Sequence, residues 1–432
     1  MPEQSQPVRA EVAAGVLSSS RVSSVLATTA VGTAVLAYVL RQTIGWAGLI
    51  AIIVVLVVVC SLSLAAQWNT VGWRGLLPIS LLAFVGWAGA SVFWSEYQWA
   101  SLAGFGYLVA FTILGIYIAL TRDTIQIIRS YGDVLRVVLL AGLALEVFAG
   151  LLIDSRIEFL NIAGNLDSLG SIQGLSGTRN QLGIVAVIAL VTFGTELRTK
   201  SIPRGLAIIS LVAAGLAIVL SRSPVAIGAL VLLALAGAAL YLLRRVASSR
   251  RRFWQFGLLA LTVMAAIAAW VLRGPIVAAL NGAGELNHRL AVWNDVWNLI
   301  GLFPLEGWGW VGLWRNEIVP FQAFAVFGAR TPTSSLNAFL DVWLQLGLVG
   351  FVIFIGMLGV TFTRSWLLAS QRRSIIFAWP ALVLVVLLVS SLAESTILIE
   401  FGWLTFVVCC VKASRELSWR TAFVATRGSR PN

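Results

Sequence analysis

The sequence has little charge for its length. Of its 432 residues only 11% are charged and 59% are apolar, and the mean hydropathy is +0.92. Soluble globular domains carry about 25% charged residues, so this composition excludes a water-soluble protein. At about 20 apolar residues per transmembrane helix, the chain has room for about ten to twelve spans.

Histidine and cysteine are also scarce. The single histidine, His288, excludes a His-rich metal site. The three cysteines lie inside apolar runs and are typical of small buried side chains rather than of a disulfide framework. They are Cys60, Cys409 and Cys410. Long apolar runs such as 49–66 lack the two-residue alternation of a barrel strand. We therefore expect an all-α polytopic membrane protein.

Apolar runs and their breaks predict twelve transmembrane helices within a domain that covers residues 24–411. The predicted spans lie near 24–40, 45–66, 75–94, 101–120, 134–153, 181–195, 204–220, 224–243, 253–272, 337–361, 375–393 and 396–411. Residues 1–23 have no cleavable signal pattern and are expected to form a polar cytoplasmic tail. Residues 412–432 are expected to form a basic cytoplasmic tail.

The distribution of basic residues predicts which side each loop faces. With both termini in the cytoplasm, 22 of the 30 Lys and Arg residues fall on internal segments and eight on external ones, as the positive-inside rule requires. Topology and anionic lipid explain basic clusters such as 244–252, so the net charge of +12 does not require a nucleic-acid partner.

Two external segments are too long to be simple turns. They lie near 154–180 and 273–336. Long ordered loops in a compact protein usually carry function, so we expect the working face to be extracytoplasmic.

External arginines are the strongest candidates for ligand binding. Arg222 lies between two apolar runs, where an arginine costs about 2.5–3.5 kcal/mol and usually faces a cavity or a ligand. Its planar fork suits phosphate oxygens, although it could equally cap a tight turn and extend to the interface. Arg179 and Asn180 lie where a glycine-rich loop enters a helix, which favours an anion there or is an ordinary interfacial turn.

The second long loop and the spans after it hold the remaining candidates. Leu290, Trp293 and Trp297 predict an amphipathic helix along the membrane surface that also carries His288 and Arg289. His288 is a potential general base, although a lone histidine is more often incidental.

Polar residues open and close the last predicted spans. Asn337 and Asp341 are four residues apart on one helical face, and Asn337 is also a plausible N-cap. Glu394 and Glu400 flank the turn before the last span, where they could move protons or pair with external arginines.

Three glycines spell GxGxxG, but they do not predict a dinucleotide site. No strand precedes Gly307, Gly309 and Gly312, and no βαβ unit surrounds them. A tight backbone turn is the better interpretation.

Taken in order, these segments resemble the O-antigen ligase and polymerase superfamily. GTRNQLG is similar to the family's Gly–Asn turn and SRSPVAIGAL to its Ser–Arg span. HRLAVWNDVWNLIGLFPLEGWGW is similar to its long periplasmic loop, and LNAFLDVWLQLGLVG to its Asn-led helix. The resemblance covers roughly residues 170–410 and depends on the order of four segments, each of which is weak alone.

The resemblance implies a metal-independent membrane glycosyltransferase of the broad GT-C type, without a cofactor. Such an enzyme moves a glycan from an undecaprenyl-diphosphate carrier to another lipid-linked glycan or to a different acceptor. Partner envelope-polysaccharide assembly proteins are possible. Arg222 and Arg289, with Arg179 as a third candidate, would then bind the donor diphosphate and stabilise its charge as it leaves.

The chain departs from the family at one position. A His–Asn pair usually opens the helix after the long loop, but here Leu336 precedes Asn337. Either His288, Asp341 or Glu394 accepts the acceptor's proton, or the departing diphosphate drives the reaction with little base assistance.

Two other functions remain open at this point. A lipid-linked oligosaccharide flippase would need polar or charged residues near mid-membrane in several spans, where we find Glu146 and scattered Ser, Thr and Gln. A non-catalytic subunit of a polysaccharide assembly complex is consistent with Leu336.

Overall fold

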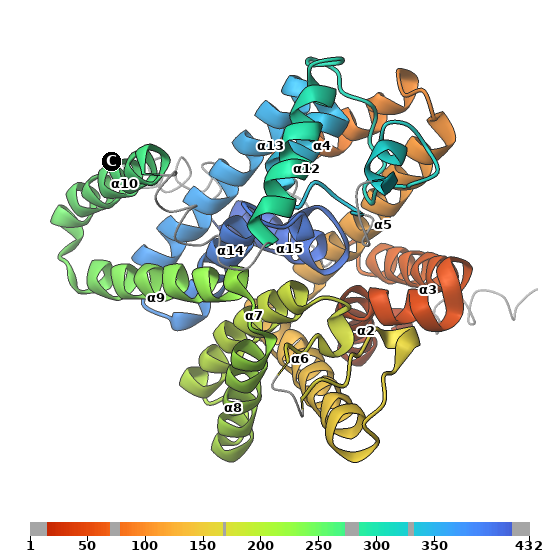
Figure 1. Cartoon of the computed structure of the whole chain (residues 1–432). Helices are drawn as coiled ribbons and strands as arrows, with labels where there is room; N and C mark the ends of the chain where they lie inside the picture. The colour runs from red at the N-terminus through yellow and green to blue at the C-terminus, as the bar shows by residue number, and fades with distance from the viewer. Residues whose placement is uncertain (1–14, 70–77, 167–169, 273–284, 327–331, 417–432) are drawn as a thin grey trace, which may run out of the picture.

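The computed structural model describes residues 15–69, 78–166, 170–272, 285–326 and 332–416. Every regular element within these ranges is a helix, and the β-type pairing there is a single isolated bridge between Ile157 and Ile162. The all-α fold class is therefore confirmed. Figure 1 shows the helices packed around one another as a bundle.

Seven of the described helices are long and apolar enough to cross a membrane. They are α3 (Ala37–Ala66), α5 (Gln98–Thr121), α6 (Thr124–Val147, extended by a π-helical segment to Leu152), α7 (Arg179–Thr199), α8 (Arg204–Ser221), α9 (Pro224–Arg245) and α13 (Ala338–Gln371). The other helices are α2 (Ser20–Val35), α4 (Ile79–Ala90), α10 (Ser248–Val271), α12 (Glu285–Ile300), α14 (Ala378–Ser390) and α15 (Glu400–Glu416). The chain is a multi-pass membrane protein, and the exact number of twelve spans stays a prediction.

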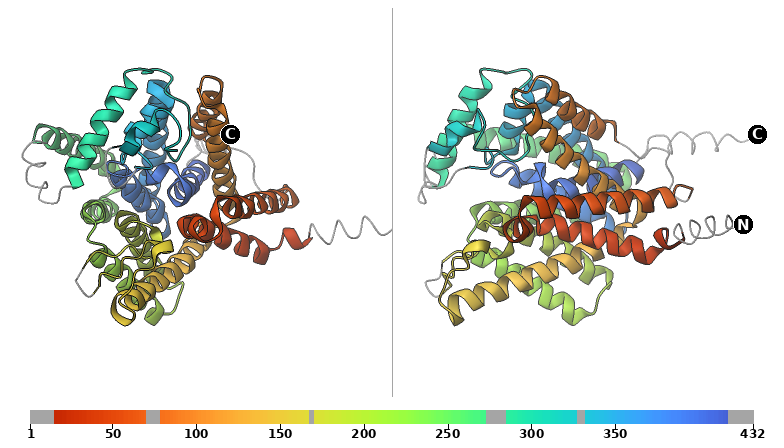
Figure 2. Two further views of the ribbon diagram at one scale, coloured as in Figure 1. Left: turned by 45° about the vertical axis from the view of Figure 1, so that its right-hand side comes forward. Right: turned by 90° about the vertical axis from the view of Figure 1, so that its right-hand side faces the viewer.

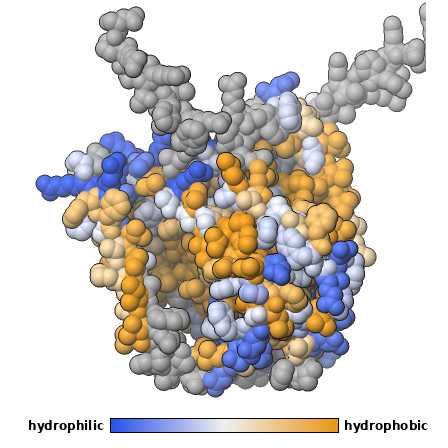
Figure 3. Space-filling view, turned by 90° about the horizontal axis from the view of Figure 1, so that it is seen from above, coloured by the Kyte–Doolittle hydropathy of each residue, from blue (hydrophilic) through white to orange (hydrophobic). Residues whose placement is uncertain are grey.

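The centre of the bundle is formed by α7 and α15. Residues from Phe401 to Ser414 of α15 are all buried, and α15 packs on α2, α5, α13 and α14. Helix α7 packs on α6, α8, α9 and α14. Outer helices such as α3 and α9 instead expose apolar side chains, including Val54, Val58 and Leu235. Broad apolar patches are visible on the face shown in Figure 3, as expected of a surface in contact with lipid.

Helix α13 contains a break at Gly347. Its 34 residues would extend about 51 Å as one straight helix, which exceeds the hydrocarbon thickness of about 30 Å. Gly347 has a φ of 66°, and a Cβ at this position would collide with the carbonyl oxygen of Leu305. The amide of Leu348 donates to the Pro304 carbonyl at 2.9 Å. The break therefore lets the chain around residue 305 pass directly against the helix.

Helix α12 is the predicted amphipathic helix of the long loop. Its buried side chains are Arg289, Val292, Val296 and Ile300, which pack toward α13. Leu290 and Trp297, which marked the predicted apolar stripe, are exposed instead. The helix therefore has two apolar faces, one against the protein and one directed outward. Figure 2 shows α12 and the segment near residues 153–166 at the same end of the bundle.

Candidate active site

Four polar side chains from separate parts of the chain meet at this end of the bundle. Glu394 Oε1 accepts hydrogen bonds from Arg289 Nη2 at 2.8 Å and from Asn180 Nδ2 at 2.7 Å. Asn180 Oδ1 accepts a bond from Ser223 Oγ at 2.7 Å. We call Asn180, Ser223, Arg289 and Glu394 the Glu394 cluster. It joins α7, the start of α9, α12 and the connection between α14 and α15.

Helix N-termini surround the cluster because capping residues start the helices there. Thr178 caps α7 by accepting from the amide of Gln181 at 3.2 Å, and Ser223 caps α9 by accepting from Ala226 at 3.1 Å. Asn337 caps α13, with bonds from Phe339 and Leu340 at 3.0 and 3.2 Å, and its Nδ2 donates to the Leu392 carbonyl at 3.2 Å. Each N-terminus carries about half a positive charge, so the cluster lies in an environment that favours anions.

Arg289 is the cation at the centre of the cluster. Only 7% of the residue is exposed, and its guanidinium also donates to the carbonyls of Ala393 and, at 3.5 Å, of Leu336. A buried arginine needs such partners because removing its charge from water costs several kcal/mol. Its planar fork satisfies the carboxylate and the carbonyls together, which an ammonium group would do less well.

The other two predicted arginines flank the cluster. Arg222 is the C-cap of α8, has a φ of 47°, and directly precedes Ser223. Its side chain is exposed and forms no hydrogen bond or ion pair with any residue that the structure describes. Arg179 is the half-buried first residue of α7 and directly precedes Asn180. All three predicted diphosphate ligands are thus in the cluster or one residue from it.

Asp341, which was predicted as a catalytic candidate, makes its side-chain hydrogen bonds to residues outside the Glu394 cluster. It is 1% exposed, and its Oδ1 accepts from Trp314 Nε1 at 2.7 Å and from Gln345 Nε2 at 2.9 Å. The Gln345 side-chain oxygen accepts from the amides of Val311 and Gly312 at 2.8 and 2.9 Å. These contacts attach the long loop to α13, which is a positioning role.

The glycine-rich stretch forms the predicted tight turn. Gly307, Gly309 and Gly312 have φ values of 72°, 101° and 71°. The amide of Gly309 donates to the Gln345 carbonyl at 2.8 Å, next to the break in α13. Side chains at these positions would meet neighbouring atoms or strain the backbone, so the glycines serve loop docking.

Comparison with known proteins gives one family match. Residues 209–355 match the family model described as O-antigen ligase. Over this segment the match supports the resemblance to the O-antigen ligase and polymerase superfamily. A search among curated proteins found no match. The matched segment spans about a third of the chain and includes Arg222, Arg289, Asn337 and the docked loop, whereas Asn180 and Glu394 lie outside it.

Where the resemblance leads us to expect a histidine before Asn337, the chain has Leu336. Leu336 has a φ of 53°, and its backbone carbonyl faces Arg289. His288 does not replace the family histidine within the cluster: it is exposed and has no hydrogen-bond partner among the residues that the structure places. Among the three predicted base candidates, Glu394 is therefore the one that belongs to the cluster.

Glu394 and Glu400, which flank the turn before the last predicted span, both pair with arginines. Besides the Arg289–Glu394 pair, Arg41 forms an ion pair with Glu400, which also accepts from the Tyr107 hydroxyl at 2.9 Å. The Tyr38 ring lies against Gly177, just before Arg179, so this second pair adjoins the same region.

Sequence reasoning missed Arg41, Tyr107 and Ser223 as partners. The Ser-Pro start of α9 was the available signal for Ser223 as a cap.

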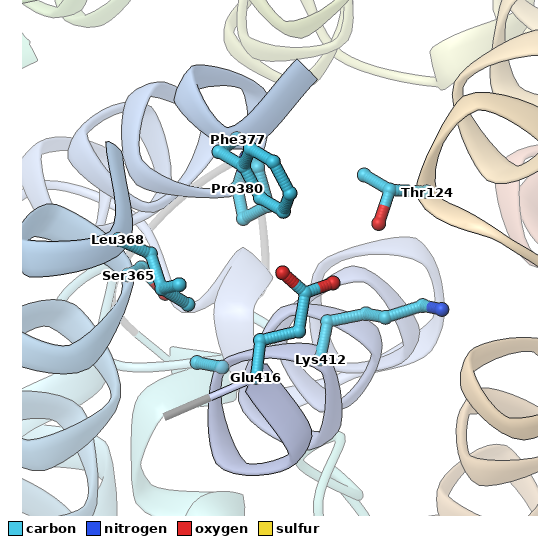
Figure 4. Close-up of a pocket in the computed structure, with 8 residues that line it drawn as sticks. Thr124, Ser365, Leu368, Phe377, Pro380, Lys412 and Glu416 are labelled. Atoms are coloured by element: carbon cyan, nitrogen blue, oxygen red, sulfur yellow. The ribbon is translucent and has the colours of Figure 1, made fainter. Parts of the chain in front are cut away.

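Two further sets of polar side chains lie at the other ends of these helices, away from the Glu394 cluster. Lys412 and Glu416 line a cavity of about 10 Å³ among α13, α14 and α15 (Figure 4), which holds about one water molecule. Arg136 forms a buried ion pair with Glu196 at 2.7 Å and bonds to Ser210 Oγ at 2.7 Å. This pair joins α6, α7 and α8 inside the bundle.

Proposed function

We propose that this protein is a glycosyltransferase of the bacterial inner membrane that moves a glycan from an undecaprenyl-diphosphate donor to an acceptor on the extracytoplasmic face. The observation that carries the proposal is the Glu394 cluster, in which Arg289 lies among helix N-termini with Arg222 exposed beside it. The family match supports the reaction class. Polymerase and ligase activity share this donor site, and the proposal covers both.

The donor diphosphate would take the place that Glu394 now occupies opposite Arg289. A diphosphate presents more negative charge and more acceptor oxygens to guanidinium groups than one carboxylate does, and phosphate binds arginine bidentately as carboxylate does. Arg222 has no carboxylate partner among the described residues, so it would contact the second phosphate without first breaking an ion pair. The helix N-termini add partial positive charge that stabilises the leaving diphosphate.

Displacement from Arg289 would make Glu394 available as the base. In the proposed step, the acceptor hydroxyl oxygen bonds to the anomeric carbon of the donor and the bond from that carbon to the diphosphate oxygen breaks. The acceptor proton moves to the Glu394 carboxylate, and the electron pair leaves with the diphosphate. Asn180 would hold the carboxylate in place during the transfer, because it already donates to Glu394 at 2.7 Å. Glu394 would thus be the proton acceptor, a role that the Leu336 side chain cannot fill.

The test is transfer from a lipid-diphosphate glycan by the protein reconstituted in liposomes. We expect Arg289→Ala and Arg222→Ala to lower transfer by at least about 100-fold, the range for loss of one group that stabilises developing charge. Arg156→Ala is the control, because Arg156 is exposed in the other long loop and has no described ion pair. Normal transfer by both cluster variants would overturn the proposal.

The lipid intermediates of a null strain separate the alternatives. A polymerase leaves single repeat units on the carrier outside, and a ligase leaves long chains there. Intermediates trapped on the inner side would identify a flippase and contradict the proposed transferase.

A further inference from the structure

An apolar groove lies at the far end of two helices that contribute to the Glu394 cluster. Its volume is about 280 Å³, and it lies between α7, α9 and α14. Leu190, Leu233, Leu240 and Leu382 form much of its wall. Asn180 and Ser223 lie at the opposite ends of α7 and α9, about 15–30 Å away along the helix axes. The groove is therefore separate from the proposed donor site.

Two glycines hollow out the groove. Gly194 of α7 and Gly237 of α9 both line it, and a Cβ at either position would meet no atom within 4 Å. The hydroxyl of Thr195, which also lines the groove, donates to the Val191 carbonyl of its own helix at 2.8 Å. The walls therefore offer hydrocarbon and empty space, which suit an alkyl chain.

Positive charge lies at one end of the groove. Arg244 lines it, and two backbone carbonyls fix its guanidinium: Nε donates to Ala369 at 2.8 Å and Nη2 to Ser374 at 3.3 Å. Arg245 lies over the ring of Tyr241, another lining residue, at 4.3 Å. Neither arginine forms an ion pair with a carboxylate in the described part of the chain.

We propose that the groove binds one acyl chain of an anionic phospholipid whose headgroup phosphate contacts Arg244 and Arg245. An apolar channel that ends in two unneutralised arginines complements an amphiphile with an anionic head. Phosphatidylglycerol carries a net negative charge there, whereas phosphatidylcholine brings a cationic choline toward the arginines. Lipid in this groove would fill the space between α7 and α14. It would hold α7, which carries Asn180, at a fixed separation from α14, which leads into the segment with Glu394.

The donor's polyprenyl chain is the competing occupant. Its diphosphate would lie at the Glu394 cluster, so only a distal part of the tail would reach the groove and no phosphate would meet Arg244. The headgroup preference of the site therefore distinguishes the two lipids.

The experiment is native mass spectrometry of the full chain released from micelles that contain 1-palmitoyl-2-oleoyl phosphatidylglycerol or the corresponding phosphatidylcholine. We expect the wild type to retain one phosphatidylglycerol, at least about 10-fold more than phosphatidylcholine. Gly237→Leu fills the groove and should remove that adduct. Gly228→Leu is the matched control, because Gly228 is on the exposed side of α9 with open space around it.

Arg245→Gln tests the headgroup contact without touching the backbone bonds of Arg244. It should reduce the preference for phosphatidylglycerol to about 3-fold or less while Gly228→Leu keeps the wild-type value. Retention of the lipid by Gly237→Leu, or equal retention of both phospholipids by the wild type, would overturn the proposal. So would a Gly237→Leu protein that keeps phosphatidylglycerol but loses undecaprenyl diphosphate, since the groove would then belong to the donor.

Discussion

Charged residues inside an apolar chain were the most informative positions at the scale of single residues. Arg179, Arg222 and Arg289 could be selected from sequence because an arginine near an apolar run needs a partner. Which partner each one has could not be predicted, since Arg289 and Glu394 are 105 residues apart. The periodicity of apolar residues predicts which face of a helix is buried, but it does not predict contacts between residues that are 105 positions apart in the sequence.

Substitution of Glu394 distinguishes a base from a structural counterion. Glu394→Gln keeps the shape and the hydrogen-bond acceptor but cannot take a proton, so we expect transfer to fall by about 100-fold or more. The melting temperature should change much less than in Glu394→Ala, which leaves Arg289 without an acceptor at Oε1. Transfer assays and thermal unfolding of the same preparations provide both readouts.

His288→Ala is the matched comparison for the base. His288 is exposed and lies outside the cluster, so we expect its substitution to change transfer by less than about 3-fold, well below the loss for a general base. A 100-fold loss of transfer in His288→Ala, together with normal transfer by Glu394→Gln, would identify His288 as the base in place of Glu394.

Individual helices were easier to predict than the way they pack. The amphipathic helix at 285–300 and the turn at Gly307 follow from local pattern, and both are present. The buried face of α12 was not predicted, because Trp297 and Val296 are both apolar and only the tertiary structure selects Val296. The break at Gly347 was also missed, since a glycine in a long apolar run gives no local sign of the loop that crosses it.

The break in α13 makes a prediction about stability. Gly347→Ala should lower the melting temperature by several degrees, because the positive φ strains alanine and its Cβ would collide with Leu305. Gly356→Ala and Gly359→Ala lie in the same helix with open space around them and should be neutral or stabilising. Equal effects at all three positions would contradict a specific role for the break.

At the scale of the whole molecule, a polar contact in the interior joins three helices. Arg136 and Glu196 are both buried, and loss of Glu196 leaves the buried guanidinium with only the exposed Asp133 as a counterion. We expect Glu196→Ala to destabilise the protein by about 3–5 kcal/mol, measured by denaturant unfolding in detergent. Asp133→Asn, which removes the exposed partner of the same arginine, should cost less than about 1 kcal/mol. Similar losses of unfolding free energy in Glu196→Ala and Asp133→Asn would contradict the greater importance of the buried pair.

The orientation of the bundle is the remaining whole-molecule prediction. A cysteine introduced at exposed Leu302 should react with a membrane-impermeant maleimide added outside the cell. A cysteine introduced at exposed Ala247 should react only after the membrane is permeabilised. The three native cysteines are buried and give little background. Reversed labelling would place the termini outside and the Glu394 cluster in the cytoplasm.

The Glu394 cluster also constrains the order in which the protein matures. Asn180, Ser223 and Arg289 are all synthesised before the carboxylate that joins them. At about 5–20 residues per second, the 105 residues from Arg289 to Glu394 take roughly 5–20 s to translate. During this interval the nascent chain presents an arginine whose counterion does not yet exist. The site is therefore completed only when residue 394 has been synthesised. A chain that stops earlier lacks the counterion of Arg289, and proteases of the membrane could recognise this unpaired arginine.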